Sequence, residues 1–482
     1  MNQLSSFSLG FRGDLWHNPA LYYHYTPYTW TDVRIGGSVD DRGDASLRQT
    51  GDKDTHYGLD VNSFVILNDH NRVFGTAGYS VDKQKNVVWN ENIDWALVAP
   101  YVTGDSIGGF LNGETYYLSG GYAAQVGSRW SWGLEAKYRA AHNYRDKDPR
   151  PYNTASDLSA TAGGSYLLGR YRIGLAADFR IYQQNSSISF LADKGSSSVF
   201  HMLGLGMDYV RFAGNQTGVK YQGLQWGAAA SLLPVANDSG LSASLAIQRM
   251  SIDKKLTSAN HLTLLNLATT DLSASIAWMR PMAPARHIGL KLDAALTSRK
   301  GTENLYGEAG GNSYGTLISE SPGIDISYAQ LALTALWEQL PADDRRWGGA
   351  LLPTVAYTAL STDYASVHRS LDVSSMQASL RARLQYQASR WALSAEALGG
   401  YFANLSADYV LPGLNTAKSS AQTLMHNISY LSDSYAVAGL SLKADWALTK
   451  QYGLSFGVQY QASIFDACGT AHHAACSVGF IF

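Results

Sequence analysis

The last part of the chain brings together residue types that bind soft metal ions. Cys468 and Cys476 enclose His472 and His473, and thiolate and imidazole groups together suit zinc or copper. Adjacent histidines on an extended chain point to opposite sides, which makes joint ligation by this pair awkward. Cysteines that are exported enter an oxidising compartment. We therefore expect a disulfide between Cys468 and Cys476, with a Cys-His metal site and free thiols as the alternatives.

Two acidic stretches offer a different ligand chemistry. Residues 40–44 and 51–54 are rich in aspartate, and carboxylate oxygens are the ligands that calcium prefers. Arg42 and Lys53 lie within these stretches and neutralise part of the charge, and the spacing is not that of an EF-hand. We expect a solvated loop here, no metal site, and no cofactor.

A catalytic histidine is the third chemistry to consider. His142 and Asn143 end a polar segment, but no serine lies at a recognisable triad spacing from them. The chain has 12 histidines in 482 residues, so one more histidine by itself carries little information. We therefore expect that the protein is not an enzyme.

Charged residues alternate with apolar ones in several segments. In Leu134–Ala140, the charged residues Glu135, Lys137 and Arg139 occupy every second position. On a helix they would spread around all faces, whereas on a strand they share one face. Across the chain the same pattern selects seven basic and four acidic residues that we expect to face a common polar interior, where they pair with one another or line a pathway with a mild anion preference. They are Glu135, Lys137, Arg139, Asp178, Arg180, Lys291, Asp293, Arg381, Arg383, Lys443 and Asp445.

The composition excludes several protein classes. The hydrophobic content of 45% with a net charge of −2 is not that of a disordered chain. The 37 basic residues are balanced by 39 acidic ones, so we expect no nucleic-acid partner. The longest nearly apolar run, Trp226–Ala236, is far shorter than the about 20 residues of a membrane-spanning helix.

The remaining profile is that of a transmembrane β-barrel. Aromatic residues reach 12%, charged residues only 16%, and the mean hydropathy is −0.16. In a barrel half of each strand faces lipid and half faces a polar lumen, so the mean hydropathy stays near zero, and Tyr and Trp collect at the membrane interfaces. We therefore predict an all-β fold with a single closed, antiparallel transmembrane barrel.

The alternating segments predict about 18 strands, or as few as 14 if two hairpins are extracellular. Short periplasmic turns and long extracellular loops separate them, as in outer-membrane barrels. The long stretch 185–221 contains apolar residues and could carry its own hairpin. The expected strands lie near 28–40, 54–67, 72–86, 114–126, 130–142, 156–168, 171–184, 222–233, 239–252, 270–281, 287–300, 326–339, 347–360, 376–388, 391–403, 434–448, 453–464 and 475–482. The expected long loops include 143–155, 253–269, 361–375 and 404–433.

The two ends of the chain carry separate signals. Residues 1–27 contain several aromatic side chains and no export leader, so we expect a mature N-terminal segment that enters the periplasmic mouth like a plug, followed by a barrel over 28–482. A simple additional strand or tail is the alternative for residues 1–27. Val478, Phe480 and Phe482 share one face of the last strand and end in an aromatic residue. This pattern resembles the C-terminal signal by which outer-membrane proteins are recognised for assembly.

Five segments carry a likeness to a known family: Trp95–Gly109, Glu114–Tyr122, Tyr138–Ala141, Asp148–Pro151 with Ser156–Leu158, and Tyr209–Phe212. They resemble an uncharacterised outer-membrane β-barrel family of Bacteroidetes, defined only as a domain of unknown function. The resemblance implies a barrel in the outer membrane of a Gram-negative bacterium, whose gene often lies near that of a TonB-dependent receptor. It supplies no catalytic or binding residues. A shorter stretch, His17–Ala20, is similar to part of the plug of long-chain fatty-acid transporters.

Three functional hypotheses follow from this interpretation. The first is a narrow or plugged substrate channel. The second is an accessory barrel of a nutrient-uptake complex, with a TonB-dependent receptor or a surface lipoprotein as its partner. The third is a transporter of hydrophobic substrates that resembles the long-chain fatty-acid transporters. In each case outer-membrane lipid, including lipopolysaccharide, surrounds the barrel.

The alternation makes a prediction about Leu384. Leu384 is expected to face lipid, because it alternates with the lumen-facing Arg381, Arg383 and Gln385. Replacing Leu384 with Arg should therefore lower the free energy of unfolding in bilayers by about 2–4 kcal/mol. The measurement is denaturant titration of the barrel in lipid vesicles. A Leu384→Arg barrel as stable as the parent would show that this side chain does not face lipid.

Overall fold

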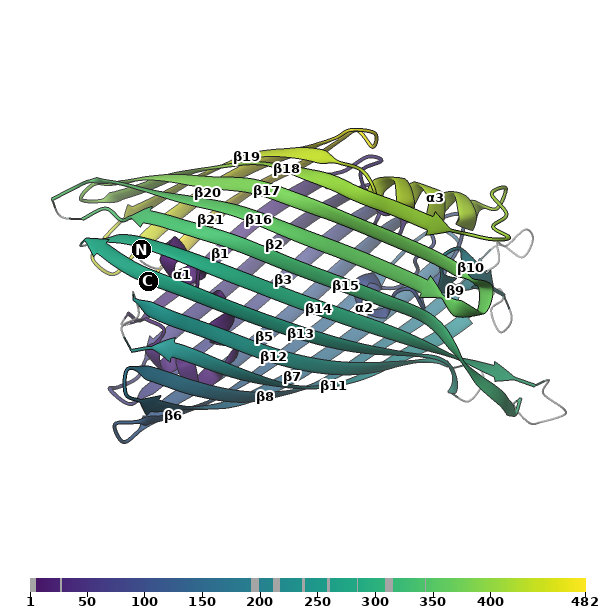
Figure 1. Ribbon diagram of the computed structural model, residues 1–482, viewed down its shortest axis with the longest axis horizontal. Coiled ribbons are helices and arrows are strands. Elements are labelled where there is room, and N and C mark those ends of the chain that lie inside the picture. The colour runs from purple at the N-terminus through teal and green to yellow at the C-terminus, as the bar shows by residue number, and fades with distance from the viewer. Residues whose placement is uncertain are drawn as a thin grey trace.

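A computed structural model describes residues 6–26, 28–191, 199–210, 217–235, 239–257, 261–283, 285–307, 315–342 and 344–482. Its main feature is one closed sheet of 18 antiparallel strands (Figure 1). Each strand pairs with the next one along the chain, and the last pairs with the first, so the sheet has no free edge. The all-β barrel predicted from the alternation is confirmed.

All barrel strands overlap the predicted ranges; those that follow a short turn begin within one residue of the prediction, whereas several that follow a long loop begin five to nine residues earlier. They are β1 (Trp30–Asp41), β2 (Lys53–Ile66), β3 (Asn71–Val87), β5 (Gly109–Val126), β6 (Trp130–Tyr144), β7 (Arg150–Leu168), β8 (Tyr171–Ser189), β11 (Thr217–Pro234), β12 (Gly240–Leu256), β13 (Leu262–Ala283), β14 (Arg286–Tyr306), β15 (Leu317–Gln339), β16 (Trp347–Tyr364), β17 (Arg369–Gln387), β18 (Trp391–Val410), β19 (Tyr435–Ala447), β20 (Gly453–Phe465) and β21 (Thr470–Ile481).

Many strands are longer than predicted. A strand of about 9–11 residues crosses the membrane, whereas β13, β14 and β15 have 22, 21 and 23 residues. The additional residues lie at the ends that carry the long loops. The predicted long loops 143–155, 253–269 and 361–375 were therefore mostly wrong, because polar strand residues above the membrane have the composition of a loop.

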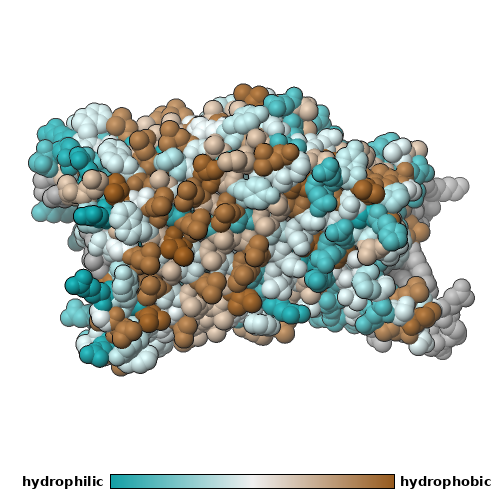
Figure 2. All heavy atoms as spheres, viewed as in Figure 1, coloured by the Kyte–Doolittle hydropathy of each residue, from teal (hydrophilic) through white to brown (hydrophobic). Residues whose placement is uncertain are grey.

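The outer surface of the barrel is apolar over its middle. Figure 2 shows apolar side chains gathered across the central part of the barrel and polar ones toward both ends. The exposed side chains there include Leu134, Leu175, Leu290 and Leu384. A closed antiparallel barrel with such a surface satisfies all its backbone hydrogen bonds internally, as a membrane-spanning protein must. The chain is an outer-membrane β-barrel.

Short helices and a small three-stranded sheet lie in the segments that are not part of the barrel wall. At the end where both termini lie are α1 (Phe7–Gly10) and the 3-10 helices η1 (Gly13–His17) and η2 (Pro19–His24). The opposite end carries α3 (Ser419–Leu431), and α2 (Trp95–Val98) lies in the long connection between β3 and β5. The small sheet joins β4 (Thr103–Gly104), β9 (Phe200–Gly204) and β10 (Met207–Tyr209). The β9–β10 pair confirms the hairpin expected within 185–221.

No helix among the described residues is long and apolar enough to span a membrane.

The predicted disulfide between Cys468 and Cys476 is wrong: both cysteines are free thiols. Cys468 lies in the turn before β21, where its backbone N–H donates to Asp433. Cys476 lies within β21, paired with Val458. The six residue steps from Thr470 to Cys476 along an extended strand span about 20 Å, whereas a disulfide needs Cα atoms within about 7 Å. A short separation in sequence misled the prediction because the segment is strand, not loop.

The C-terminal strand β21 closes the barrel between β1 and β20. Val478, Phe480 and Phe482 lie on its outer face and are exposed. This is the surface an assembly factor would meet, and the role of these residues as an assembly signal stays a prediction.

The free thiols make a measurable prediction. Burial, and then a hydrogen bond to Asp433, raises the pKa of Cys468 to about 11. Because only the thiolate reacts, the alkylation rate of Cys468 in the folded protein should rise about tenfold per pH unit from pH 8 to 10. Mass spectrometry of unfolded, non-reduced protein should find both thiols alkylated. A peptide joining Cys468 to Cys476 would contradict the structure.

Candidate functional site in the barrel lumen

The start of the N-terminal segment contacts β15 and β17 of the barrel wall. The side chain of Ser6 caps α1. The backbone N–H groups of Phe7 and Ser8 donate to the Glu338 carboxylate on β15, at 2.7 and 3.1 Å. The guanidinium of Arg383, on β17, lies 3.8 Å from the centre of the Phe7 ring. A negative carboxylate at the first turn of a helix and a cation over a ring face are both favourable contacts.

The end of this segment is tied to the opposite wall. Asn18 donates from Nδ2 to the carbonyl oxygens of Gly164 on β7 and Leu175 on β8, both at 3.3 Å. Its Oδ1 accepts from the backbone of Ala20. A Cβ atom at Gly163 would lie 2.0 Å from Asn18 Oδ1, so only glycine permits this approach.

Because one short segment contacts strands on both sides of the barrel, it lies inside the lumen. Beyond Asn18, Tyr22 stacks on Phe74 of β3 with ring centres 4.1 Å apart. The described residues 6–26 thus line much of one end of the lumen, while residues 1–5 and 27 of the predicted segment 1–27 lie outside the described residues.

The connection between β3 and β5 also turns inward, from the other end of the barrel. Asp94, just before α2, accepts from Arg139 of β6 at 2.6 Å and from the hydroxyl of Tyr182 of β8 at 2.7 Å. The buried Lys254 of β12 donates to the carbonyl of Val102 at 2.8 Å. We call residues 88–108 the inward loop. Lumen-facing side chains of at least three strands hold it in place.

An apolar core seals the inward loop against the wall. Val98, Tyr101 and Val102 are buried with Leu203 of β9 and Ile324 of β15, among others. Because β4 pairs with β9, the loop also shares a sheet with the β8–β11 connection. Burial of this many apolar side chains makes the end with the long loops a packed structure and not an open mouth.

Helix α3 connects the apolar core of the inward loop to the β1–β2 connection. Ile428 of α3 belongs to the same apolar core. Asn427 accepts from the backbone N–H of Arg48 at 3.1 Å and donates to Gln49 at 2.7 Å, and His426 Nε2 lies 3.0 Å from the carbonyl oxygen of Ser46. The β18–β19 connection is thereby bonded to the β1–β2 connection.

A buried charge cluster fixes the fold of the inward loop. Arg145 lies 2.9 Å from the Glu91 carboxylate and 3.2 Å from that of Asp105, and all three side chains are buried. Burial, and then the neighbouring Asp105, raises the pKa of Glu91 well above its usual range. Burial opposes ionisation of Asp105 too, but hydrogen bonds from Glu91 and from the Gly108 N–H, together with Arg145, lower its pKa. Burial thus favours the protonated form of Glu91, while Arg145 and the hydrogen bonds favour the ionised form of Asp105.

The structure pairs nearly all the charged residues that the alternation selected. Lys137 bonds to Glu135, Lys291 to Asp293 and Lys443 to Asp445, each at 3.1–3.2 Å. Arg381 and Arg383 share Glu396, and Arg139 and Arg180 share Asp157. Asp178 accepts from Gln225 and Gln248.

Sequence reasoning missed the acidic partners Asp94, Asp157 and Glu396. Asp157 and Glu396 follow the strand alternation, but each stands alone among Ser, Ala and Leu, so no repeated charge marked it. The signal that would have found them is the register, which places Asp157 opposite Arg139 and Glu396 opposite Arg383. These carboxylates offset the surplus of basic residues counted from the sequence.

The two adjacent histidines near the C-terminus point to different partners. His472 contacts the hydroxyl of Tyr460, while His473 lies 2.8 Å from Asp40 of β1. Within the described residues no group of three or more His, Cys, Asp or Glu side chains could hold a metal ion.

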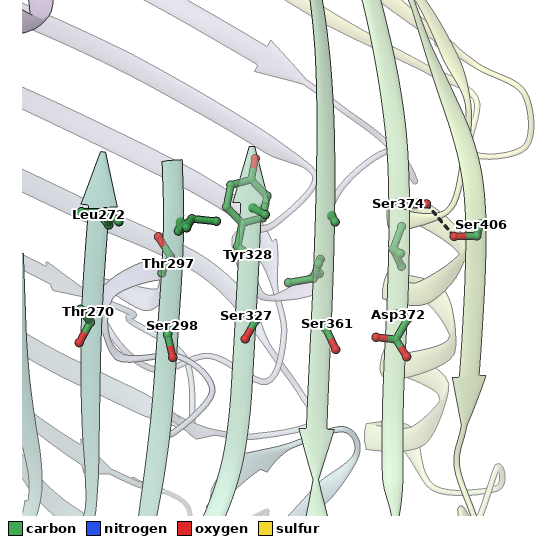
Figure 3. A pocket seen from close by; sticks show the side chains of 15 residues that line it. Thr270, Leu272, Thr297, Ser298, Ser327, Tyr328, Ser361, Asp372, Ser374 and Ser406 are labelled. Atoms are coloured by element: carbon green, nitrogen blue, oxygen red, sulfur yellow. Dashed lines mark hydrogen bonds between the residues drawn. The ribbon is translucent and has the colours of Figure 1, made fainter. Parts of the chain in front are cut away.

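Two cavities differ in where they open. One, of about 300 Å³, lies in the lumen between η1 and β11–β15. The other, of about 420 Å³, crosses β13–β18, and Figure 3 shows Thr270, Ser298, Ser327 and Ser361 side by side across four of these strands. These residues alternate with inward ones and share their face with the exposed Leu272, so the second cavity lies on the outer surface, at the edge of the apolar band.

Comparison with known proteins adds the following findings. A family model described as "Family of unknown function (DUF6850)" matches residues 19–482. No curated protein matches. The ferric preacinetobactin receptor BauA from Acinetobacter baumannii is 10% identical, with 95% of this chain and 80% of that chain covered and a TM-score of 0.41. The ferric-catecholate import receptor Fiu from E. coli K12 is 9% identical, with 95% of this chain and 82% of that chain covered and a TM-score of 0.40. A bacterial polysaccharide outer membrane secretin is 11% identical, with 94% of this chain and 97% of that chain covered and a TM-score of 0.39.

The Glu91 cluster predicts how the inward loop responds to pH. The pKa of Glu91 is raised in the folded protein, so its stabilising effect is fully present below the unfolded pKa of about 4.3 and is lost as the pH rises through the folded pKa. The free energy of opening residues 88–108 should therefore fall with rising pH. Glu91→Gln, which stays neutral, should remove this slope.

Hydrogen exchange across pH 5–9, corrected for intrinsic rates, measures the effect. Glu320→Gln is the control, since Glu320 is exposed on β15 outside the cluster, and it should keep the slope of the parent. Equal slopes in the parent and in Glu91→Gln would show that Glu91 is already ionised.

Proposed function

The chain belongs to the DUF6850 family of unknown function, and we propose from its geometry that it is a plugged outer-membrane channel for small polar solutes. The observation that carries this proposal is the polar lumen occupied from both ends. The N-terminal segment is bonded to Glu338 and to the backbone of β7 and β8. The inward loop is bonded to Arg139, Tyr182 and Lys254.

The character of these contacts supports segments that can move. Inside a lumen, water can replace each hydrogen bond that a departing segment gives up, so polar contacts cost less to exchange than an apolar core. The N-terminal segment combines such contacts with three small apolar clusters, around Phe7, Leu15 and Phe64. The inward loop has a larger apolar core. We therefore assign the N-terminal segment the role of the movable plug and the inward loop that of a fixed constriction.

The lumen chemistry supports polar solutes over hydrophobic ones. Ion pairs such as Lys443 with Asp445, and hydrogen-bonded polar side chains such as Gln225 with Asp178, face the lumen. A fatty-acid chain would have to desolvate these groups without offering them hydrogen bonds. This proposal assigns the protein no catalytic step.

One observation favours a second candidate, the accessory barrel. The outer cavity of Figure 3 lies at the edge of the apolar band, with apolar residues such as Leu272 and Leu296 along one side and hydroxyl groups and the exposed Asp372 along the other. Asp363 and Asp408 lie exposed nearby on the same face. A polar, acidic outer surface suits a partner protein with basic side chains, such as a TonB-dependent receptor or a surface lipoprotein. Purification from native membranes tests it: a stoichiometric second protein lost on Asp372→Lys would favour the accessory role.

The plug makes a prediction about conductance. In planar bilayers the intact barrel should conduct far less than an open porin, and removal of residues 1–27 should raise the conductance severalfold, because the lumen then loses its inner segment. Glu338→Ala should have a smaller effect in the same direction, since it frees the backbone of Phe7 and Ser8. Glu320→Ala, an exposed site on the same strand, is the matched control. Large, steady conductance from the intact chain would contradict the plug.

A further inference from the structure

The lumen cavity of about 300 Å³ is a recess in the barrel wall itself. Ser231, Ser244 and Ser275 lie opposite one another on β11, β12 and β13. Ala229, Ala246 and Ser273 are aligned in the neighbouring row. Since the side chains of both rows are short, the wall is hollow here, with an apolar Ala floor and a row of hydroxyl groups beside it.

Larger polar side chains stand at the edge of this recess. Asp293 continues the serine row on β14, and Gln330 continues the alanine row on β15. Lys291, two residues before Asp293, completes the edge. The recess therefore offers carboxylate and amide acceptors, amide and ammonium donors, and hydroxyl groups that do both.

The N-terminal segment closes the open side of the recess. Leu15, His17 and Asn18 line the cavity opposite the wall. Asn18 is held by its bonds to β7, β8 and Ala20, and Leu15 is buried. His17 is exposed, although it lies within the barrel. The site thus exists only while the segment is in place, and movement of the segment would open it.

The charges of the recess are balanced. Lys291 Nζ lies 3.1 Å from Asp293 Oδ1, so this pair brings hydrogen-bonding capacity without net charge. An anion or a cation entering the recess would have to compete with this pair and shed its own hydration. An uncharged solute with many hydroxyl groups meets no such penalty, and its C–H faces fit the Ala floor and Leu15.

From this arrangement we propose that the recess binds a small uncharged polyhydroxylated solute, of the size of a monosaccharide or short oligosaccharide. A volume of about 300 Å³ is at the small end of the range of ligand sites. The proposal rests on the proposed function, because it makes this solute the cargo that the plug retains. Asp293 and Gln330 would bind the hydroxyl groups of the solute, and Ala246 would contact its ring face.

Binding to the purified full-length barrel tests the proposal, with glucose and maltose as probes and glutamate, lysine and octanoate as comparators. Equilibrium dialysis should show saturable binding of at least one sugar and of none of the comparators. Ala246→Phe fills the recess and should weaken sugar binding at least tenfold. Gln330→Ala removes an amide without adding bulk and should weaken it severalfold.

The matched control is Ser441→Phe, the same kind of enlargement on the lumen face of β19, where Ser441 lies opposite Glu396 and Gln459. It should bind sugar like the parent. Resistance of the folded barrel to SDS shows that each variant folds. Sugar binding that survives both Ala246→Phe and Gln330→Ala, a complete lack of sugar binding, or saturable binding of a comparator would overturn the proposal.

The binding measurement and the conductance measurement test the recess and the channel separately. If sugar binds but the barrel without residues 1–27 does not conduct, the recess stands as a binding site and the channel is wrong. If the shortened barrel conducts but the intact chain binds no sugar, the channel stands and the recess is not its site.

Discussion

The pairing of β1 with β21 is the constraint on which the rest of the structure depends. In lipid an unpaired strand edge would leave backbone N–H and C=O groups without partners at a cost of several kcal/mol each, so the sheet must close. Once closed with 18 strands, the barrel encloses a space too wide for opposing side chains to fill. Additional chain must enter the lumen, or the lumen must hold water. In this protein the N-terminal segment and the inward loop occupy part of it, and both are held by side chains that project from the wall.

The charges inside the barrel follow from the same constraint. A charge that faces a partly filled lumen has less water around it than one on an open surface, so it needs a nearby partner. Pairs within one strand, such as Lys291 with Asp293, and pairs between strands, such as Arg383 with Glu396, supply that partner. Arg139 uses its partners for a further purpose, since it contacts both Asp157 in the wall and Asp94 in the inward loop. Wall electrostatics and the position of the inward loop are thereby connected.

Strand positions could be predicted from the sequence because the period of two is a local property, and the 18 observed strands overlap the 18 expected ranges. The disulfide prediction was wrong because separation in sequence says nothing about extension. The strand ends above the membrane were missed because buried apolar residues such as Leu267 and Val373 lie there, so the simple alternation of apolar with polar residues is lost. The partners Asp94 and Glu396 could not be predicted, since each depends on which distant strand or loop lies opposite. Likewise, no local pattern indicates that Gly163 leaves room for Asn18.

The central claim is that the N-terminal segment lies inside the lumen, and a cross-link measures this most directly. With Cys468→Ser and Cys476→Ser as background, Asn18→Cys removes the amide oxygen that would clash with a Cβ atom at position 163, so that Gly163→Cys can place a second thiol in contact with the first. The account predicts that this pair forms a disulfide under mild oxidation in native membranes, while Asn18→Cys combined with Ser441→Cys does not. A disulfide in neither pair, with both thiols alkylated after unfolding, would contradict a segment held inside the barrel.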